Sequence, residues 1–218
     1  MLQDLIKFLD QLYQNNNTEW FQTHKSEYQT YKKEFEDLVS EVIGEIYHID
    51  PLIGWLSVKD CTFRINRDIR FSNDKSPYKA RFAAAFAPGG KIGQKPNYYF
   101  HIGHDGKIII GAGIYSISSE QLARLRQNIS DKLEDFHQIL DQPDFKKVFP
   151  ELKGETLQKM PRGFEPEDPA RDYLKHKIFI VARTVDANQF KNEGEFIQEL
   201  SQNFKLGYPF IKFLRENI

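Results

Sequence analysis

The sequence predicts an α+β fold with a central, mainly antiparallel sheet of about five strands, flanked by N-terminal and C-terminal helices. Two observations favour this fold class. Stretches that alternate apolar and polar residues, which is typical of half-buried strands, cluster in the middle of the chain. Stretches with apolar residues at helical spacing lie before and after them. Because strands and helices do not alternate one by one, a parallel sheet is not expected.

Helices are predicted wherever apolar residues recur at helical spacing. The expected ranges are residues 2–14, 18–47, 118–140, 143–148, 169–174, 187–190 and 193–217. Asn15–Asn17 separates the first two helices, and Asn17 or Thr18 caps the second. The last helix is expected to kink or break near Gly207, because Pro209 lacks the backbone N–H that an unbroken helix would use.

Strands are predicted where apolar and polar residues alternate between turn-forming residues. The expected ranges are residues 61–67, 79–87, 97–104, 107–115 and 177–184. Asp105–Gly106 is a strong signal for a hairpin between the third and fourth of these strands. Gly111 and Gly113 have two interpretations: a trough where another backbone, an aromatic ring or a ligand can approach, or a bulge or close packing of a helix.

Length and composition predict one soluble domain over residues 1–218. The chain has 218 residues, a net charge of −1 and 40% hydrophobic residues, and no linker rich in Gly, Ser or Pro divides it. No apolar run approaches the ~20 residues of a membrane span, and the first residues do not look like a signal peptide. The single cysteine, Cys61, excludes an internal disulfide and fits a reducing compartment. We therefore expect a cytoplasmic protein; its oligomeric state is not indicated.

The stretch from Phe63 to Arg81 concentrates positive charge. It contains six cationic residues and two acidic ones, a local net charge of +4 in a nearly neutral chain. Guanidinium groups present planar sets of donors that suit phosphate or carboxylate oxygens, so the stretch is a candidate anion site. The alternative is a solvated charged loop in which Asp68 and Asp74 pair with the arginines.

Three function classes follow from this stretch. The first is a module that binds a phosphorylated or acidic ligand, and the second is an enzyme acting on such a small molecule or on nucleic acid, with Asp68 or His101 as the acid/base group. The third is a structural or partner-binding protein whose arginines pair with its own acids, Glu167 included. The candidate ligand-binding residues are Arg64, Arg67, Asp68, Arg70, Lys75, Tyr78, Lys79, Tyr99, His101 and Arg183.

Other chemistries lack the residues they need. The six histidines are scattered, and His101 and His104 would point to opposite faces of one strand, so no metal site is predicted. Cys61 has no base beside it in the sequence, and no nucleophile elbow, dinucleotide fingerprint or P-loop is present. No cofactor is therefore predicted. The near-neutral charge argues against nucleic acid as the partner without excluding it, and an anionic small molecule is the expected one.

Four stretches spread over nearly the whole chain match the pattern of one known family. They are N-N-N-T-E-W-F at residues 15–21, F-R-I-N-R-D-I-R-F-S-N-D-K-S-P-Y-K at residues 63–79, the hairpin from Y-Y-F-H-I to G-A-G-I-Y at residues 98–115, and P-R-G-F with H-K-I-F-I-V-A-R at residues 161–164 and 176–183. With them the chain resembles a bacterial family of uncharacterised proteins catalogued as domain of unknown function 2461. Asn66 departs from the aromatic residue expected at its position. The resemblance implies no established activity, cofactor or substrate, but it strengthens the hypothesis of a site on the basic stretch.

Overall fold

The computed structural model describes residues 2–70, 72–91 and 93–218, and its sheet is antiparallel throughout. Four strands pair in the order β1-β2-β3-β4. Their bounds are Arg81–Phe86 (β1), Asn97–Gly103 (β2), Lys107–Ile114 (β3) and Phe179–Asp186 (β4). The predicted α+β class is confirmed, with one strand fewer than expected.

Helices precede and follow these strands, as the sequence predicts. The α-helices in the described residues are α1 Leu2–Gln14, α2 Thr18–Thr23, α3 Lys25–Ile49, α4 Val58–Cys61, α5 Ser119–Asp131, α6 Leu133–Leu140, α7 Pro143–Val148, α8 Arg171–Leu174 and α9 Glu193–Asn217. Two short 3-10 helices are η1 Pro51–Ile53 and η2 Ala187–Gln189. Among the described helices, none combines the length and hydropathy needed to cross a bilayer.

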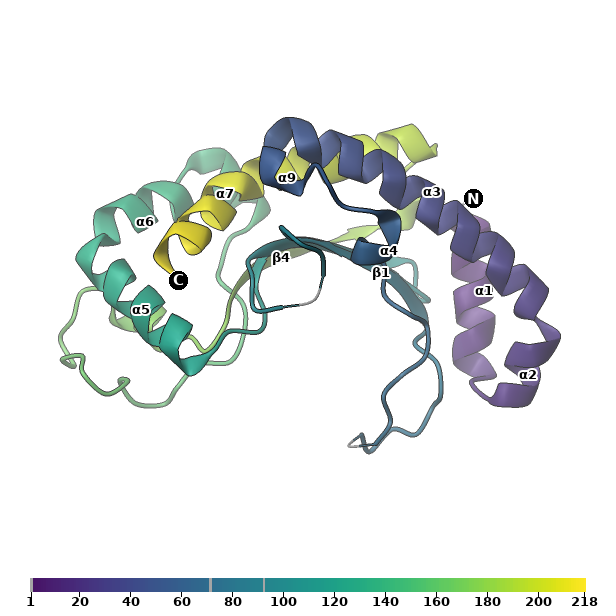
Figure 1. Cartoon of the computed structure of the whole chain (residues 1–218), viewed down its shortest axis with the longest axis horizontal. Coiled ribbons are helices and arrows are strands. Elements are labelled where there is room, and N and C mark those ends of the chain that lie inside the picture. The colour runs from purple at the N-terminus through teal and green to yellow at the C-terminus, as the bar shows by residue number, and fades with distance from the viewer. Residues whose placement is uncertain (1, 71, 92) are drawn as a thin grey trace.

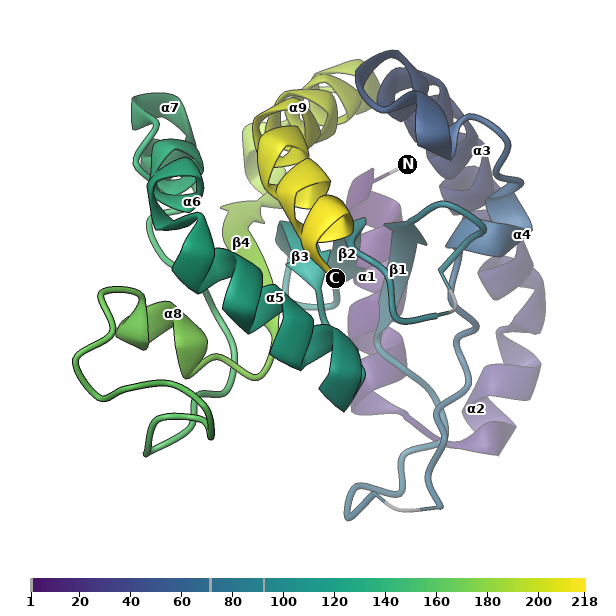
Figure 2. The ribbon, with the colours of Figure 1, turned by 60° about the vertical axis from the view of Figure 1, so that its left-hand side comes forward.

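The helices cover one face of the sheet. Helix α9 packs on β3 and α3 packs against α9, so the two long helices lie side by side over the strands (Figures 1 and 2). Helices α1 and α2 lie at one end of the molecule and α5–α7 at the other, and Figure 1 shows no helix beneath the opposite face. Side chains such as Phe100 and Ile110 point toward the helices and are fully buried, whereas Tyr99 and Ile109 point the other way. The molecule therefore has the shape of an arch.

The predicted strand over residues 61–67 is wrong as a regular strand. Val58–Cys61 is a short helix, because the Asp60 carboxylate accepts hydrogen bonds from the N–H of Ser57 (3.0 Å) and from its hydroxyl (2.6 Å). In the described residues the chain then pairs through two isolated bridges, Thr62 to Ala84 in β1 and Asn66 to Tyr78, which precedes β1. The N–H of Phe63 donates to the carbonyl of Ala83, and the N–H of Lys79 donates to the carbonyl of Ile65. One residue therefore faces three between these two bonds, and this bulge interrupts a continuous ladder.

Two of the predicted helices are each divided into two, and the last predicted helix continues past its proline. The helix expected over residues 18–47 is broken at His24, and the one expected over residues 118–140 is broken at Lys132. In contrast, α9 continues past Pro209 without interruption, and Figure 2 shows it bending along its length. The packing of α9 on the sheet therefore holds the helix together, and proline produces a kink rather than an end.

Glycines on β3 allow the close approach of β4. A Cβ atom added to Gly111 would lie 2.7 Å from the carbonyl oxygen of Val181, and one on Gly113 would overlap the carbonyl oxygen of Phe179. Gly113 also has φ +139°, a conformation that L side chains rarely adopt. The neighbour that these glycines admit is the backbone of β4, so the structure bears out the approach of another backbone and not the packing of a helix.

A buried ion pair joins the two long helices. Arg215 of α9 donates to the carboxylate of Asp50 at the end of α3 (2.6 Å), and the Tyr98 hydroxyl donates to the same oxygen (3.1 Å). The Asp50 side chain is 1% exposed, so removing either partner would leave an uncompensated charge inside the protein. Burial, followed by the neighbouring Asp50 carboxylate, raises the pKa of Tyr98.

Alanine substitutions at Gly113 and at Gly44 should have opposite effects on stability. Gly113→Ala should lower the free energy of unfolding by about 2–4 kcal/mol, because it adds an overlap and a strained φ. Gly44→Ala should raise it by about 0.5–1 kcal/mol, because Gly44 lies inside α3 with open space around it. Urea denaturation of both variants measures the difference. Similar stability of Gly113→Ala and the parent protein would contradict the proposed role of close β3–β4 packing.

Candidate functional site

The basic stretch forms an arm that extends below the sheet (Figure 1). Its outgoing and returning segments pair antiparallel: the Arg67 N–H donates to the carbonyl of Pro77 (2.9 Å), and the Lys79 N–H donates to the carbonyl of Ile65 (2.8 Å). Ile65 and Tyr78 are each 5% exposed and belong to the hydrophobic core. The base of the arm is therefore held by buried apolar side chains.

Asn16 attaches this arm to the N-terminal helices. Its side-chain amide donates to the carbonyl of Tyr78 (3.0 Å) and accepts from the N–H of Tyr78 (3.1 Å), which imitates the pairing of a β-strand. The Tyr78 ring stacks on Phe21 of α2, with ring centroids 4.0 Å apart. The motif over residues 15–21 thus does more than join two helices, although Asn17 also caps α2 through the N–H of Trp20 (2.9 Å).

Ion pairs occupy the tip of the arm. The Arg70 guanidinium donates to the carboxylate of Asp68 (2.6 Å), and Arg67 forms a salt bridge with Asp74. Hydrogen bonds from Ser76 and Arg67 lower the pKa of Asp74 to about 2, so this carboxylate is ionised at neutral pH. The interpretation of the stretch as a set of internal ion pairs therefore describes its tip.

Cations at the base of the arm have no such partners. Within the part of the chain that the structure describes, no carboxylate lies at salt-bridge distance from Arg64, Lys79 or Arg81. The Lys79 ammonium donates to the carbonyl of Arg64 (2.9 Å) and lies 5.8 Å from the centre of the Phe63 ring. Burial lowers the pKa of Lys79, and the nearby guanidinium groups, Arg81 first, lower it further. Positive charge is therefore concentrated where the arm joins the sheet.

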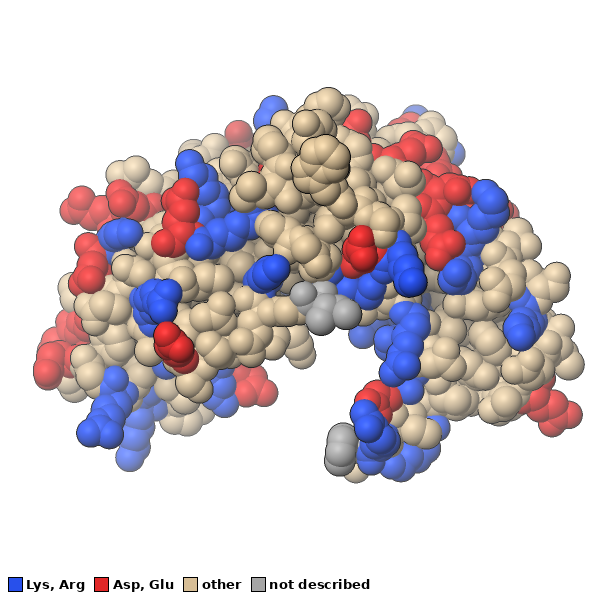
Figure 3. Space-filling model, viewed as in Figure 1, with Lys and Arg blue, Asp and Glu red and all other residues tan. Residues whose placement is uncertain are grey.

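A cleft of about 440 Å³ opens beside Lys79 and Arg81. It lies between the arm, the end of α1 and the turn after β2. Its lining residues are Tyr13, Asn16, Arg67, Asp68, Asp74, Ser76, Tyr78, Lys79, Ala80, Arg81 and His104. In the space-filling view the lower side of the molecule is hollowed, and Lys and Arg side chains gather along the wall formed by the arm (Figure 3).

Tyr99 and His101 lie on the open face of the sheet next to this cluster. The Tyr99 hydroxyl is 3.0 Å from Nδ1 of His101, and β2 pairs His101 with Ala83, two residues from Arg81. Burial, and then the positive charge of Arg81, lower the pKa of His101 to about 4. Burial raises the pKa of Tyr99. At neutral pH the pair is therefore an uncharged imidazole and a phenol, adjacent to a cation.

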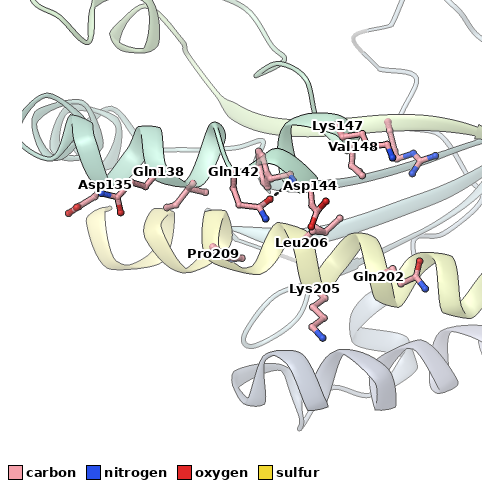
Figure 4. A pocket seen from close by; sticks show the side chains of 13 residues that line it. Asp135, Gln138, Gln142, Asp144, Lys147, Val148, Gln202, Lys205, Leu206 and Pro209 are labelled. Carbon is pink, nitrogen blue, oxygen red and sulfur yellow. Dashed lines mark hydrogen bonds between the residues drawn. The ribbon is translucent and has the colours of Figure 1, made fainter.

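Arg183 is not part of this cluster. It lies on the helix-facing side of β4, where it forms a salt bridge with Glu199 of α9 (3.0 Å). There it lines a separate open groove of about 1000 Å³ between α6, α7 and α9. Figure 4 shows this groove, with Leu206 and Pro209 on one wall and Gln142 and Asp144 on the other.

The other predicted ligand-binding residues divide between the tip and the base of the arm. Arg70 and Lys75 belong to the tip, where the Lys75 ammonium donates to the carbonyl of Ile69 (3.0 Å).

Four residues line the cleft although they were not among the predicted site residues: Arg81, Asn16, Tyr13 and His104. Strand alternation could have identified Arg81, because residues 81 and 83 point to the same face of β1 and Ala83 pairs with the predicted site residue His101. The others depend on contacts between distant segments.

Metal and thiol chemistry find no support in the described residues. Among them, no three His, Cys, Asp or Glu side chains come together as a metal site would require. Cys61 is fully buried, and burial raises the pKa of its thiol to about 12, so it is not a thiolate nucleophile at neutral pH.

Comparison with known proteins supports the resemblance seen in the motifs. A family model described as "Conserved hypothetical protein (DUF2461)" matches residues 4–213. No curated protein and no solved structure matches the chain. The family description names no activity, so the cleft is the basis for a functional proposal.

Replacing Asn16 tests whether it holds the arm in place. Asn16→Ala should lower the free energy of unfolding by about 1–3 kcal/mol, because the N–H and carbonyl of Tyr78 both lose a partner in a part-buried position. Asn15→Ala is the matched control, since the Asn15 side chain makes an exposed bond to the carbonyl of Gln11 within its own helical segment. Chemical denaturation compares the two, and equal losses would argue against the anchor.

The low pKa of His101 predicts a pH dependence. Its folded value of about 4 lies below the reference value of 6.5, so the unfolded chain binds more protons between these pH values. The contribution of His101 to stability is complete above about pH 6.5 and is lost as the pH falls toward 4. NMR titration, with His101→Asn to assign the imidazole signal, should give a midpoint near 4. A midpoint near 6.5 would show that the ring is solvated.

Proposed function

Because the chain belongs to the family of conserved hypothetical proteins DUF2461, which carries no assigned activity, we propose its function from the cleft: it binds an anionic small molecule. The observation that carries this proposal is that Lys79 and Arg81 line one cleft and, in the described residues, have no carboxylate at salt-bridge distance. Like charges that gather beside a cleft repel one another, and a bound anion would offset this cost.

The geometry favours Arg81 as the principal ligand-binding residue. It lines the cleft, and its positive charge lowers the pKa of both Lys79 and His101. Arg67 also lines the cleft, but Asp74 already occupies its guanidinium group. Guanidinium donors match the oxygens of a phosphate or a carboxylate, so the ligand is a phosphorylated or acidic small molecule.

Enzymatic action on the bound anion is a second candidate function. The observation that favours it is the bond between Tyr99 and His101, which orients a neutral imidazole beside Arg81. Such an imidazole can accept a proton. Asp68 is less suited to this role, because the Arg70 guanidinium already occupies both of its carboxylate oxygens and lowers its pKa, which makes it a weaker base. Release of phosphate from phosphomonoesters by the parent protein, lost in His101→Asn while phosphate still binds, would assign this function.

The setting that we propose for this function is a single domain in the cytoplasm. The hydrophobic side chains form one cluster that reaches from α1 to α9, which supports a single folding unit. The one cysteine is buried with its thiol free, which fits a reducing compartment.

Phosphate should stabilise the protein through Arg81. At about 100 times its dissociation constant, a ligand of the folded state adds ~2.7 kcal/mol of stability, so the melting temperature should rise visibly in phosphate or sulfate. Arg81→Gln should abolish the rise, because it removes the charge from an exposed position without disturbing the core. Arg171→Gln, which replaces another exposed arginine, in α8, is the matched control and should keep the rise. No rise in the parent protein, or the same rise in both variants, would refute a phosphate site at Arg81.

A further inference from the structure

An aromatic platform stands in the same cleft as the cations. The rings of Tyr13 and His104 stack almost in parallel, with centroids 3.8 Å apart and an angle of 8° between their planes. Both residues line the cleft together with Lys79 and Arg81. Tyr13 is 58% exposed although one side of its ring is covered by His104. A large part of a tyrosine ring is thus available to a ligand beside the proposed anion site.

Three segments hold this platform in position. Tyr13 lies in the last turn of α1, and His104 lies in the turn between β2 and β3. The His104 N–H donates to the carbonyl of Ala80 in the arm (3.1 Å), and Asp10 of α1 lies 3.8 Å from its Nδ1 atom. Because α1, the hairpin turn and the arm meet here, the platform does not have to be formed when a ligand arrives, which lowers the entropic cost of binding.

We propose that the ligand of this cleft is a nucleoside monophosphate, with its phosphate bound by Arg81 and Lys79 and its base stacked on Tyr13. The assignment rests on the anion-binding function proposed above and adds the second half of the ligand. A purine or pyrimidine base has a flat π-face, and stacking on an aromatic side chain recognises that face without requiring hydrogen bonds to the base edges.

The size and charge of the site favour a mononucleotide over other phosphate compounds. A sugar phosphate would use the cations but leave the Tyr13 ring without a partner. A cleft of about 440 Å³ lies within the range of pockets for small ligands, about 300–1000 Å³. A polynucleotide would need a basic surface that continues beyond the cleft, whereas the chain has a net charge of −1.

Calorimetric titration of the full chain with paired ligands tests this assignment. AMP and ribose 5-phosphate share the phosphate and the sugar, so their difference in affinity reports the base. AMP should bind about 5- to 150-fold more tightly than ribose 5-phosphate, the factor expected for one stacked base. Tyr13→Leu should remove this advantage and leave ribose 5-phosphate binding unchanged. Tyr13→Phe should preserve it, since phenylalanine keeps the ring.

A matched control and separate outcomes make the test decisive. Tyr115→Leu replaces another exposed tyrosine, at the opposite end of β3 from the cleft, and should not change either affinity. Equal binding of AMP and ribose 5-phosphate would overturn the nucleotide assignment and leave the anion site standing. Binding of neither compound nor of inorganic phosphate would overturn both proposals. Much tighter binding of a single-stranded octanucleotide than of AMP would overturn the mononucleotide in favour of nucleic acid.

Discussion

The close packing of α9 on β3 is the contact on which the rest of the structure depends. A Cβ atom on Gly207 would lie 3.0 Å from the Cβ atom of Ala112, so the helix approaches the strand to the limit that small residues allow. This approach brings the apolar side of α9 onto the sheet and lets α3 pack beside it. The buried pair of Asp50 and Arg215 then fixes the relative position of the two helices. Since buried ion pairs contribute little net stability, we assign this pair to setting the register of the two helices and not to adding free energy.

This one-sided core explains where the candidate site lies. The apolar surface of the sheet is buried against the long helices, so the opposite face is open to polar and aromatic residues that have no part in the core. Tyr99 and His101 occupy that face, and the arm continues from its edge. The arm itself is stabilised by what it buries, because Tyr78 and Ile65 reach into the core while Asn16 pairs with the backbone. A rigid base of this kind can hold cations in place for a ligand.

Charge along the arm is arranged in two zones. At the tip, Asp68 and Asp74 neutralise Arg70 and Arg67, so this part of the stretch needs no external partner. At the base, Lys79 and Arg81 remain next to a cleft and an aromatic platform. The internal ion pairs therefore describe the tip, and the proposed anion site concerns only the base, so the two hypotheses do not compete for the same part of the segment.

The sequence by itself determined the fold class, most of the helices and strands, and the family, because periodicity and motifs are properties of neighbouring residues. It also indicated His101 and the basic stretch as candidate parts of a ligand-binding site. It did not reveal that residues 61–67 lack a continuous partner, that Arg183 points to the other face of the sheet, or that Asn16 and Tyr78, 62 residues apart, are bonded. Only the tertiary structure decided which cations have no carboxylate at salt-bridge distance among the described residues, and which aromatic ring lies beside them. Both depend on distances between segments far apart in the chain.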